Sequence, residues 1–302
     1  MATKFSSYIF YCQTAVHAGD GTGTGTIDMP IQREKTTGFP VLRDSTTRGS
    51  IRESFETNIN DENKFYATFG YRENGDKASA LSVLPARLLF FPVRSFKGVF
   101  AYVTCPFILK RFIKEMKLFH NKCIKVDDKF LDIEEDNAFA SDSLFIKDDK
   151  IGLEEYIFNA TKIENGNLSP ILNLFKNDEI ERLKDHIAII NDTQFAYFTR
   201  LFTEKVTRNK INIETGVAAD TGLFNEEFLP EESILYTTFG FANEFKENGG
   251  LSDAEIQQYF DKNFTSIFQL GGDKSVGKGL ISPYKINFND SKNNCDEKSE
   301  TE

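Results

Sequence analysis

Residues 17–52 hold the side chains of this chain that are best suited to chemistry. His17 opens a stretch rich in glycine and threonine, Gly19–Gly38, which carries Asp28. An aspartate in a loop is most often only a turn former. Here hydroxyl and basic side chains follow it closely, so we predict a site that holds a phosphate beside a reactive carboxylate. His17 lies at the mouth of the same loop and is a candidate for proton transfer.

The phosphate-binding part of this predicted site is the start of a helix. Residues Ser45–Ile59 are predicted to be helical, with hydroxyl side chains in the first turn and arginines soon after. The first turn of a helix presents unpaired backbone N–H groups, which bind anions. The candidate phosphate contacts are therefore Ser45, Thr46, Thr47, Arg48 and Arg52.

A second glycine-rich segment, Gly271–Gly279, reads GGDKSVGKG and nearly matches a phosphate-binding P-loop. The motif needs Ser or Thr after its lysine to hold Mg²⁺, and here Gly279 follows Lys278. We therefore exclude nucleotide hydrolysis and expect a glycine turn that lets backbone segments approach closely. Lys274 and Lys278 in this turn remain candidate contacts for an anion.

Charge is distributed unevenly along the chain. Residues 1–125 hold 18 Lys and Arg against 11 Asp and Glu, whereas residues 126–302 hold 18 against 35. This asymmetry indicates a basic surface for an anion in the first part, although a solvated acidic insert in the second part would explain it equally well. No run of about 18 apolar residues occurs, so no membrane span is expected. The four cysteines lie far apart with no CxxC pair, which favours a cytoplasmic protein.

Short strands and helices alternate along the chain. Their order is compatible with an α+β fold that has a ferredoxin-like core with insertions. Helices are predicted after Pro106, at Asp178–Ile190 and at Ser252–Phe260. The predicted strands are Tyr8–Val16, Ala80–Val93, Lys97–Thr104, Glu204–Ile213 and Ser233–Phe239.

The expected domain organisation is one domain over residues 1–287. Within it we expect an acidic surface insert at 127–150 and a projecting loop at 213–233, and residues 288–302 are predicted to be a disordered tail. The Lys97–Val103 segment faintly matches an RNA-recognition strand with stacking aromatic side chains, although an ordinary buried strand fits it better.

Three segments together resemble one family. They are HAGDGTGTGTIDMPIQREKTTGFPVLRDSTTRGSIRE, LPARLLFFPVRSFKGVFAYVTCP and FQLGGDKSVGKGL. They are similar to the backbone subunits of the type III-B CRISPR effector complex, the Cmr complex, which belong to the RAMP group and to the seventh Cas protein family. The matching segments are spread from Ser7 to Pro283, and the middle one is the most specific.

The resemblance implies an RNA-recognition-like core that polymerises along a guide RNA together with other Cmr subunits. Each copy then inserts a thumb into the guide–target duplex, and a loop aspartate supports cleavage of the target RNA beside it. Asp28 matches that aspartate, and Ser45–Arg52 matches the phosphate-gripping helix. The thumb-like β-hairpin matches residues 213–233. The family helix commonly reads Gly-Ser-Ser-x-Lys-Gly, whereas this chain has Asp44 at its start. Asp44 brings an acid close to a phosphate site, or it is only a helix N-cap.

The residues expected to serve these functions form two sets. The RNA contacts are Ser45, Thr46, Thr47, Arg48, Arg52, Arg94, Lys97, Lys274 and Lys278. The thumb residues are Val217, Leu223, Phe224, Glu226, Glu227 and Phe228, and the two acids in this set are expected to be exposed or to reach a neighbouring copy.

The chemistry expected is RNA cleavage by the RNA's own 2′-hydroxyl, forced into line with the phosphorus. Aspartate side chains are weak bases at neutral pH, so a loosely bound Mg²⁺ or Mn²⁺ held by Asp28 and RNA oxygens is favoured over direct proton abstraction. Two alternatives stay open: a scaffold subunit that binds RNA without cutting it, and the equivalent subunit of a Csm-type complex. A small-molecule enzyme fits less well.

Overall fold

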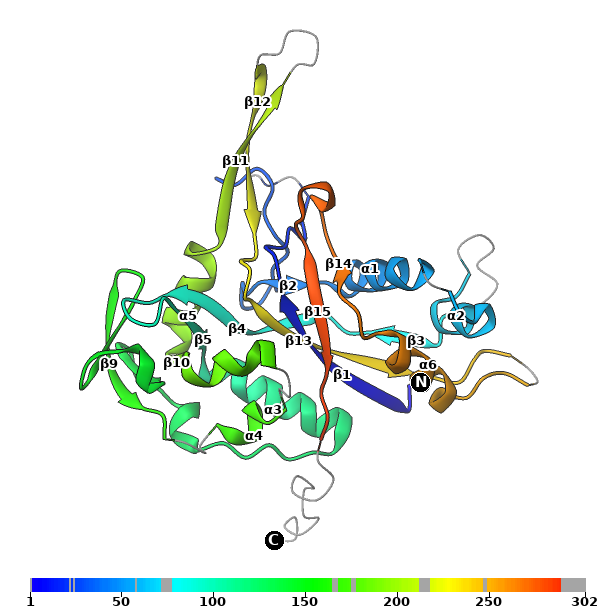
Figure 1. The fold of residues 1–302 in the computed structure, drawn as a ribbon, viewed down its shortest axis with the longest axis horizontal. Coiled ribbons are helices and arrows are strands. Elements are labelled where there is room, and N and C mark those ends of the chain that lie inside the picture. The colour runs from blue at the N-terminus through cyan, green and yellow to red at the C-terminus, as the bar shows by residue number, and fades with distance from the viewer. Residues whose placement is uncertain are drawn as a thin grey trace. The chain divides into compact units, whose positions relative to one another are not determined.

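The structure is a computed structural model that describes residues 2–21, 23, 25–57, 59–71, 78–164, 168–174, 178–211, 218–246 and 249–288. The chain divides into two compact units. Unit 1 comprises Met1–Phe91 and Ala196–Tyr284, and unit 2 comprises Pro92–Phe195 and Lys285–Glu302. Each unit combines helices with strands (Figure 1), which confirms the predicted α+β class. The ferredoxin-like core and the single domain stay predictions, and the predicted tail lies outside the described residues except for Phe288.

The sheet of unit 1 has the strand order β14-β15-β1-β13-β4. β1 and β13 run antiparallel at its centre, and nearly every residue in both is buried, so this pair forms the middle of the core. Two short strands add to the sheet: β2 pairs with β4, and β3 pairs with β13. The strands are β1 (Lys4–Cys12), β2 (Val41–Leu42), β3 (Leu81–Val83), β4 (Ala86–Arg94), β13 (Ile234–Phe241), β14 (Phe268–Gln269) and β15 (Leu280–Lys285).

Packed phenylalanine rings fill the core of unit 1. Phe260 lies with its ring centroid 4.7 Å from that of Phe239 and 5.5 Å from that of Phe55, so strand β13 and two helices share one aromatic cluster. The chain has 30 Phe and no Trp, and rings of this size bury large apolar areas. The helices are α1 (Asp44–Glu56), α2 (Glu62–Phe69), α5 (Asp192–Leu201), α6 (Asp253–Asn263) and the short 3₁₀ turn η4 (Lys274–Val276).

Two of these helices test the sequence predictions directly. α6 begins at a capping box in which Ser252 and Glu255 bond each other's backbone N–H groups, which confirms the predicted helix at Ser252–Phe260. α1 confirms the predicted helix at Ser45–Ile59, but it starts one residue earlier and ends at Glu56. Arg43 is its N-cap residue, so Asp44 lies inside the first turn and is not the cap.

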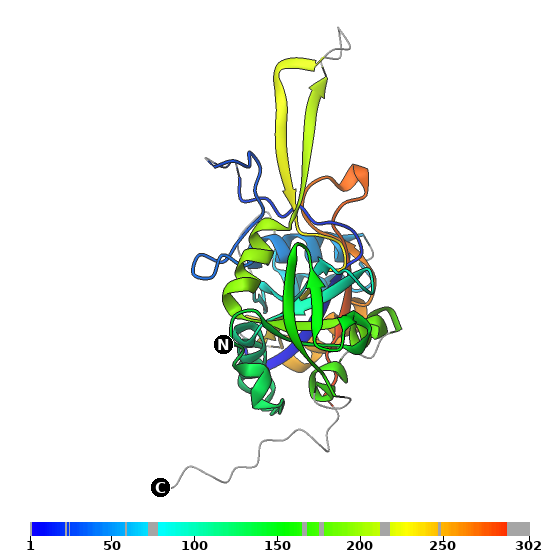
Figure 2. The ribbon, with the colours of Figure 1, turned by 90° about the vertical axis from the view of Figure 1, so that its left-hand side faces the viewer.

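Strands β11 (Glu204–Ile211) and β12 (Ala218–Phe228) form a separate two-stranded sheet in unit 1. Their register pairs Glu204 with Phe228 and Asn209 with Leu223. Figures 1 and 2 show this hairpin projecting from the rest of the unit. The predicted bounds of the projecting hairpin, 213–233, are therefore wrong, because Ala218–Phe228 is its second strand rather than a loop. Val217 lies outside the described residues.

Unit 2 contains a sheet with the strand order β5-β10-β6-β9-β8-β7. β10 runs parallel to β5 and antiparallel to β6, which leaves it buried between two neighbours. The strands are β5 (Phe100–Thr104), β6 (Asn137–Ala140), β7 (Phe145–Lys147), β8 (Lys150–Leu153), β9 (Tyr156–Lys162) and β10 (Ile187–Ile190). The helical segments are α3 (Pro106–His120), α4 (Ser169–Leu172), η1 (Asp128–Leu131), η2 (Asp142–Leu144) and η3 (Asp178–Asp185).

Unit 2 confirms one sequence prediction and corrects two. The helix predicted to start at Pro106 is α3, with that proline in its first turn. The helix predicted at Asp178–Ile190 is wrong at its end, because the apolar residues Ile187–Ile190 form the buried strand β10. The segment 127–150 is not only a surface insert: it supplies β6, which pairs with both β10 and β9. Among the described residues, the helices are all too short or too polar to cross a membrane.

Candidate functional site

Asp28 is exposed, and its loop is fixed to the base of hairpin β11–β12. The backbone N–H of Asn225 donates to Asp28 Oδ2 over 2.8 Å. On the next residue, Met29 donates its N–H to the Asn225 carbonyl at 3.0 Å, and its own carbonyl accepts from the Glu227 N–H at 3.0 Å. The loop thus runs beside β12 as a short parallel bridge. Within the part of the chain that the structure describes, Asp28 Oδ1 has no hydrogen-bond partner, so this oxygen can receive a ligand.

His17 is buried beside the same strand, with 5% of its surface exposed. Its Nδ1 lies 2.8 Å from the Glu227 carbonyl oxygen, which can only accept, so Nδ1 carries the proton. Its Nε2 then faces Glu226 Oε1 at 3.4 Å. With both ring nitrogens directed at the hairpin, His17 supports the base of β12 and does not face solvent. The expectation that it handles a proton of a bound substrate is corrected accordingly.

The glycine-rich turn 271–279 packs directly against His17. Gly272 donates its N–H to the His17 carbonyl at 2.9 Å, and a Cβ on Gly271, which has φ of +91°, would overlap that carbonyl. A Cβ on Gly19 would lie 2.8 Å from His17 Nε2. These glycines are required for close approach of backbone to a buried ring, which confirms the predicted role of the turn.

Glu226 is 4% exposed and belongs to an ionic cluster with Arg208 and Asp273, which are both half-buried. Arg208 Nε lies 2.9 Å from Glu226 Oε2, and its two terminal nitrogens lie 3.0 and 2.8 Å from the two oxygens of Asp273. Burial raises the pKa of Glu226, the charge of His17 lowers it, and the nearby Asp273 raises it again. The cluster joins both strands of the hairpin to the turn 271–279.

Glu227 is 1% exposed and is the acid that ties the Asp28 loop to β12. Its Oε1 accepts from Arg33 Nη2 at 2.6 Å and from Thr203 Oγ1 at 2.7 Å, and its Oε2 accepts from the Ile31 N–H at 3.1 Å. Arg33 and Ile31 both belong to the loop that carries Asp28. The two glutamates that we expected to be exposed on a thumb are therefore buried at its base.

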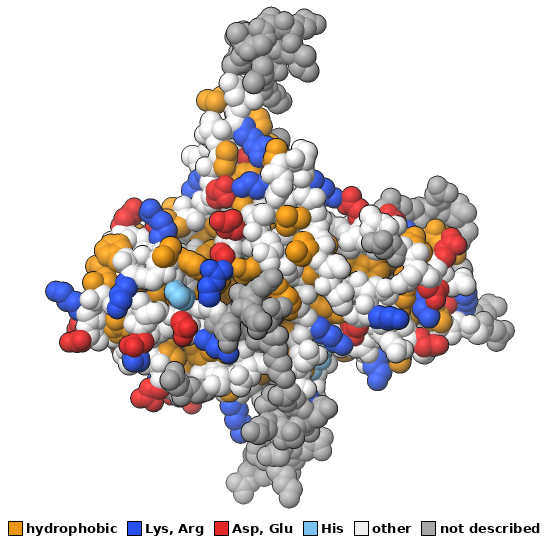
Figure 3. Space-filling view, in the orientation of Figure 1, with side chains coloured by type: hydrophobic (Ala, Val, Ile, Leu, Met, Phe, Trp, Pro, Cys, Tyr) orange, Lys and Arg blue, Asp and Glu red, His pale blue; other side chains and the backbone are white. Residues whose placement is uncertain are grey.

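The remaining thumb residues divide between the base and the exposed part of the hairpin. Phe228 is fully buried, with Lys278 Nζ 4.9 Å and the Arg208 guanidinium 5.7 Å from its ring centre. Leu223 is 71% exposed, and Phe224 is half-buried. Figure 3 shows acidic and basic side chains interleaved where the hairpin joins the rest of unit 1.

The start of α1 presents part of the predicted phosphate site. Ser45 is exposed, and Thr46 Oγ1 accepts from Gln32 Nε2 at 2.9 Å. The Thr47 hydroxyl is buried and makes no hydrogen bond in the described part of the chain. Arg48 is half-buried and donates to the Phe69 carbonyl at 2.7 Å. Ser45 and Thr46 are therefore the hydroxyls within reach of an anion.

Arg52 does not fit the predicted role of phosphate contact. It is 7% exposed, and its Nη1 donates to the carbonyls of Phe69 and Gly70 at 3.0 and 2.9 Å, which caps the end of α2. Its Nε pairs with Glu56 at 2.9 Å. With every donor directed inward, Arg52 holds α1 against α2.

The other predicted cations mostly have acidic partners. Arg94 pairs with Glu154 at 2.6 Å, Lys278 pairs with Glu204 at 3.1 Å, and Lys274 pairs with Glu53. Lys97 is exposed at the edge of a pocket of about 870 Å³ in unit 2, and no carboxylate of the described residues lies within 4 Å of its ammonium. Lys97 is therefore the most available of these cations for RNA.

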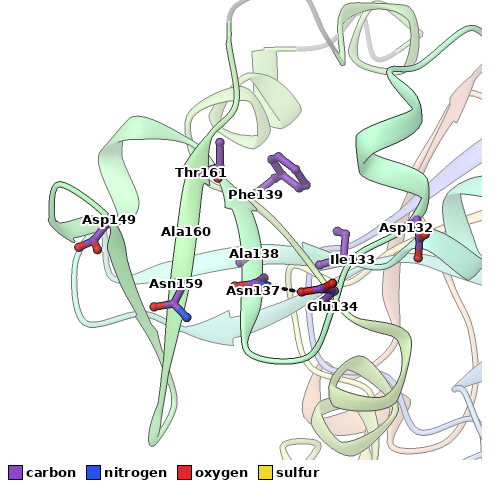
Figure 4. Close-up of a pocket in the computed structure, with 10 residues that line it drawn as sticks. All are labelled: Asp132, Ile133, Glu134, Asn137, Ala138, Phe139, Asp149, Asn159, Ala160 and Thr161. Atoms are coloured by element: carbon purple, nitrogen blue, oxygen red, sulfur yellow. Dashed lines mark hydrogen bonds between the residues drawn. The ribbon is translucent and has the colours of Figure 1, made fainter.

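A second pocket in unit 2 has the wrong charge for RNA. Strands β6 and β9 line it, and the acids Asp132, Glu134 and Asp149 stand around it (Figure 4). Glu134 accepts from Asn137 Nδ2 at 3.5 Å, so it stays partly free. Three carboxylates repel a phosphate backbone, and we assign no RNA contact here.

Asp28 would have to complete a metal site with ligands from elsewhere. Among the described residues, no three His, Cys, Asp or Glu side chains are grouped so that they could hold a metal ion. The exposed Asp28 oxygen suits a hard cation, which prefers oxygen ligands and keeps several waters. The residues present thus fit a weak site to which RNA oxygens contribute.

Comparison with known proteins places the whole chain in one group. Residues 9–282 match the RAMP superfamily. The chain is 36% identical over 278 residues to the CRISPR system Cmr endoribonuclease Cmr4 of Pyrococcus furiosus, and the match covers 90% of this chain and 92% of that protein. It is 22% identical over 298 residues to the CRISPR system CMR subunit Cmr4 of Saccharolobus solfataricus, and that match covers 90% and 94%.

Solved structures agree with the sequence relatives. Oligomeric Cmr4 from Pyrococcus furiosus, at 31% identity, matches with a TM-score of 0.74 over 95% of this chain and 99% of that chain. A chain of the type III-B Cmr-beta complex bound to cognate target RNA matches with a TM-score of 0.76 at 19% identity, over 94% and 98%, which shows the shared fold.

Proposed function

The chain belongs to the RAMP superfamily and, within it, to the Cmr4 family, and from this membership we propose that it assembles along a guide RNA and cuts the bound target RNA at regular intervals. The observation that carries the proposal is the attachment of Asp28 to the projecting hairpin: its carboxylate accepts from the Asn225 N–H at 2.8 Å and keeps one oxygen exposed. This hydrogen bond holds the Asp28 carboxylate, the proposed reactive acid, in a fixed position relative to the projecting hairpin.

The relatives support both parts of the proposal, which are assembly of several copies and cleavage of RNA. The Pyrococcus furiosus protein, 36% identical, is named an endoribonuclease, and a solved Cmr4 structure from that organism is described as oligomeric. Target RNA and other Cmr subunits are the partners that this relationship implies. A scaffold that binds RNA without cutting differs from this proposal only in what Asp28 does.

The reaction proposed is transesterification within the RNA. The 2′-oxygen loses its proton and attacks the neighbouring phosphorus, the bond from phosphorus to the 5′-oxygen breaks, and that oxygen takes up a proton. The products are a 2′,3′-cyclic phosphate and a 5′-hydroxyl. The attack requires the 2′-oxygen, the phosphorus and the leaving oxygen to lie in line, which an undistorted helix does not provide.

The hairpin is the element that we propose distorts the RNA. Its exposed part carries Leu223, 71% exposed, and an apolar side chain between bases unstacks them at a cost of about a few kcal/mol. The unstacked nucleotide would then lie beside Asp28, because the base of the hairpin and the Asp28 loop are joined. We include in this proposal that the hairpin is the thumb of a ferredoxin-like core.

Asp28 would act through its exposed oxygen. Its carboxylate can hold Mg²⁺ or Mn²⁺ together with oxygens of the RNA, and when bound the cation neutralises charge that develops on the phosphate. The residues around Asp28 hold it in place. Asn225 binds one carboxylate oxygen, and Glu227 holds the loop through Arg33 and Ile31.

The guide RNA would run over the start of α1, and in unit 2 Lys97 would be a separate contact for RNA. Ser45, Thr46 and the free N–H groups of the first turn of α1 suit a phosphate, with Arg48 one turn further on. Arg94, Lys274 and Lys278 are each paired with a carboxylate. Each of them would therefore contact a phosphate while it also keeps its acidic partner.

Electron microscopy of the purified chain with and without guide RNA tests the proposal. We expect helical filaments whose length follows the RNA length. Particles of monomer size at every RNA concentration would contradict assembly along a guide.

A further inference from the structure

The exposed face of α3 is lined by lysines. Lys110, Lys114 and Lys117 are exposed and recur every three or four residues, so they lie on one side of the helix. The opposite side is buried through Ile108 and Phe112. No carboxylate of the described residues lies within 4 Å of any of the three ammoniums. Like charges at this spacing repel each other, so an anion on this face would stabilise the helix.

Two large apolar side chains lie on the same face. Phe107 is 41% exposed and Leu118 is 71% exposed, and their positions relative to Lys110 and Lys114 place them along the same stripe. We call these five residues, Phe107, Lys110, Lys114, Lys117 and Leu118, the lysine face. Mixed basic and apolar side chains suit a peptide that carries acidic residues better than a bare phosphate.

The chain itself returns to one end of this face. After β15 the backbone reaches Phe288, whose ring centroid lies 4.9 Å from that of His120, the last residue of α3. Burial, with the charges of Lys285 and Lys122, lowers the pKa of His120 to about 4. Lys285 and Lys122 therefore lie near the end of α3 at which the chain reaches Phe288.

Residues 289–302 carry a net negative charge, which is opposite to the charge of the lysine face. They read NDSKNNCDEKSETE and contain five acids against Lys292 and Lys298. Extended at about 3.3 Å per residue, the segment is longer than α3, which has 15 residues that rise about 1.5 Å each. We propose that residues 289–302 dock along the lysine face of α3 in the same chain.

Tethering favours this occupant over a separate polyanion. A segment that starts beside His120 is present at a high effective concentration near the lysine face, whereas RNA must be drawn from solution. The inference stands independently of RNA cleavage.

Lysine acetylation measured by mass spectrometry tests the docking. In a variant that ends at Phe288, Lys110, Lys114 and Lys117 should be acetylated severalfold faster than in the full chain. Lys147, exposed on β7, serves as the control and should not change. Equal rates for the three lysines in both proteins would overturn the proposal.

A second variant tests whether charge drives the contact. Replacing Asp290 and Asp296 by Asn, and Glu297, Glu300 and Glu302 by Gln, keeps the length of the segment and should expose the lysines as fully as truncation does. Protection of the full chain should also vanish at 1 M salt, where charges are screened beyond about 3 Å. Protection that persists with the neutral segment would contradict docking by charge.

Carbodiimide cross-linking identifies the occupant. A mixture of ¹⁴N- and ¹⁵N-labelled full chains should give links between the lysine face and residues 289–302 within one isotope only. Links that join the two isotopes would assign the segment to a neighbouring copy and overturn the proposal. An excess of polyuridylate should compete for the lysines and reduce the number of links. If no links form in the absence of polyuridylate, residues 289–302 do not occupy the lysine face.

Discussion

The backbone N–H of Asn225 donates a hydrogen bond to the Asp28 carboxylate over 2.8 Å, although 197 residues separate the two in sequence. Two backbone bonds of Met29, to Asn225 and from Glu227, follow this bond along the loop, so the loop and strand β12 are joined as one piece. A hairpin pushed by RNA would carry Asp28 with it. The acid and the projecting hairpin are therefore best treated as one mechanical unit.

The first prediction concerns the length of the hairpin. Arg208 and Phe224 face each other in the register, so an Asn-Gly turn can join them and remove the residues between, Leu223 included. This variant keeps the buried base, including Glu226, Glu227 and Phe228, and should unfold at the same urea concentration as the parent. We expect weaker assembly and loss of evenly spaced cleavage products. The control replaces residues 212–217 with Gly and Ser at unchanged length and should keep the spacing.

Evenly spaced products from the shortened variant would show that the distortion arises elsewhere. In that case the hairpin would serve only assembly between copies.

The second prediction concerns the buried ion pair of Glu227 and Arg33. Glu227→Ala leaves Arg33 Nη2 and the Ile31 N–H without their acceptor, so the free energy of unfolding should fall by about 3 kcal/mol. Urea denaturation measures the loss. Glu155→Ala, at an exposed position of unit 2, is the control and should change stability by less than about 0.5 kcal/mol. A Glu227→Ala protein as stable as the parent would mean that the loop is held by backbone bonds alone.

The third prediction separates two arginines that look equivalent in sequence. Arg52→Ala removes the cap on α2 and should lower the free energy of unfolding by about 1–3 kcal/mol. Arg48→Ala leaves the Phe69 carbonyl with Arg52 as its remaining donor, so it should lower the free energy of unfolding less than Arg52→Ala does. It should also flatten the dependence of log affinity for single-stranded RNA on log salt concentration by roughly 0.7. Affinity measured at several salt concentrations checks this, and an unchanged slope would place Arg48 away from the RNA.

The fourth prediction concerns pH. The pKa of His120 falls from its ordinary 6.5 to about 4 on folding, through burial and then the charges of Lys285 and Lys122. Between these values the unfolded chain binds a proton that the folded chain does not, so stability falls as pH decreases through this window, by at most about 1.4 kcal/mol per unit. Urea denaturation at pH 6.5 and 5 should show a smaller loss for His120→Gln than for the parent. Equal losses would contradict the burial of an uncharged His120.

The sequence predicted the elements whose residues alternate or repeat clearly. Pro106 before a helical apolar repeat identified α3, and the capping pair Ser252 and Glu255 lies at the start of the helix predicted from that stretch. Residues Ile187–Ile190 were misassigned because a short apolar run fits a buried strand and the end of a helix equally well, and only pairing with β5 and β6 decides between them.

The candidate site was predicted in part. Asp28 was found because hydroxyl and basic residues follow it in sequence. The burial of Glu226 and Glu227 was missed, because acids are rarely buried unless paired and their partners Arg208 and Arg33 lie far away in the chain. Arg52 was misassigned for the same reason: nothing local indicates that its guanidinium caps another helix.

Target cleavage by a complex assembled with Asp28→Asn tests the central claim most directly. Asn keeps an oxygen that can accept from the Asn225 N–H but removes the negative charge, so loop position and RNA binding should be preserved. The account predicts normal binding of guide and target and no spaced products in Mg²⁺ or Mn²⁺, and the same loss for Asp28→Ala. Cleavage at the parental rate by both variants would contradict it and would leave the chain as a scaffold that binds RNA.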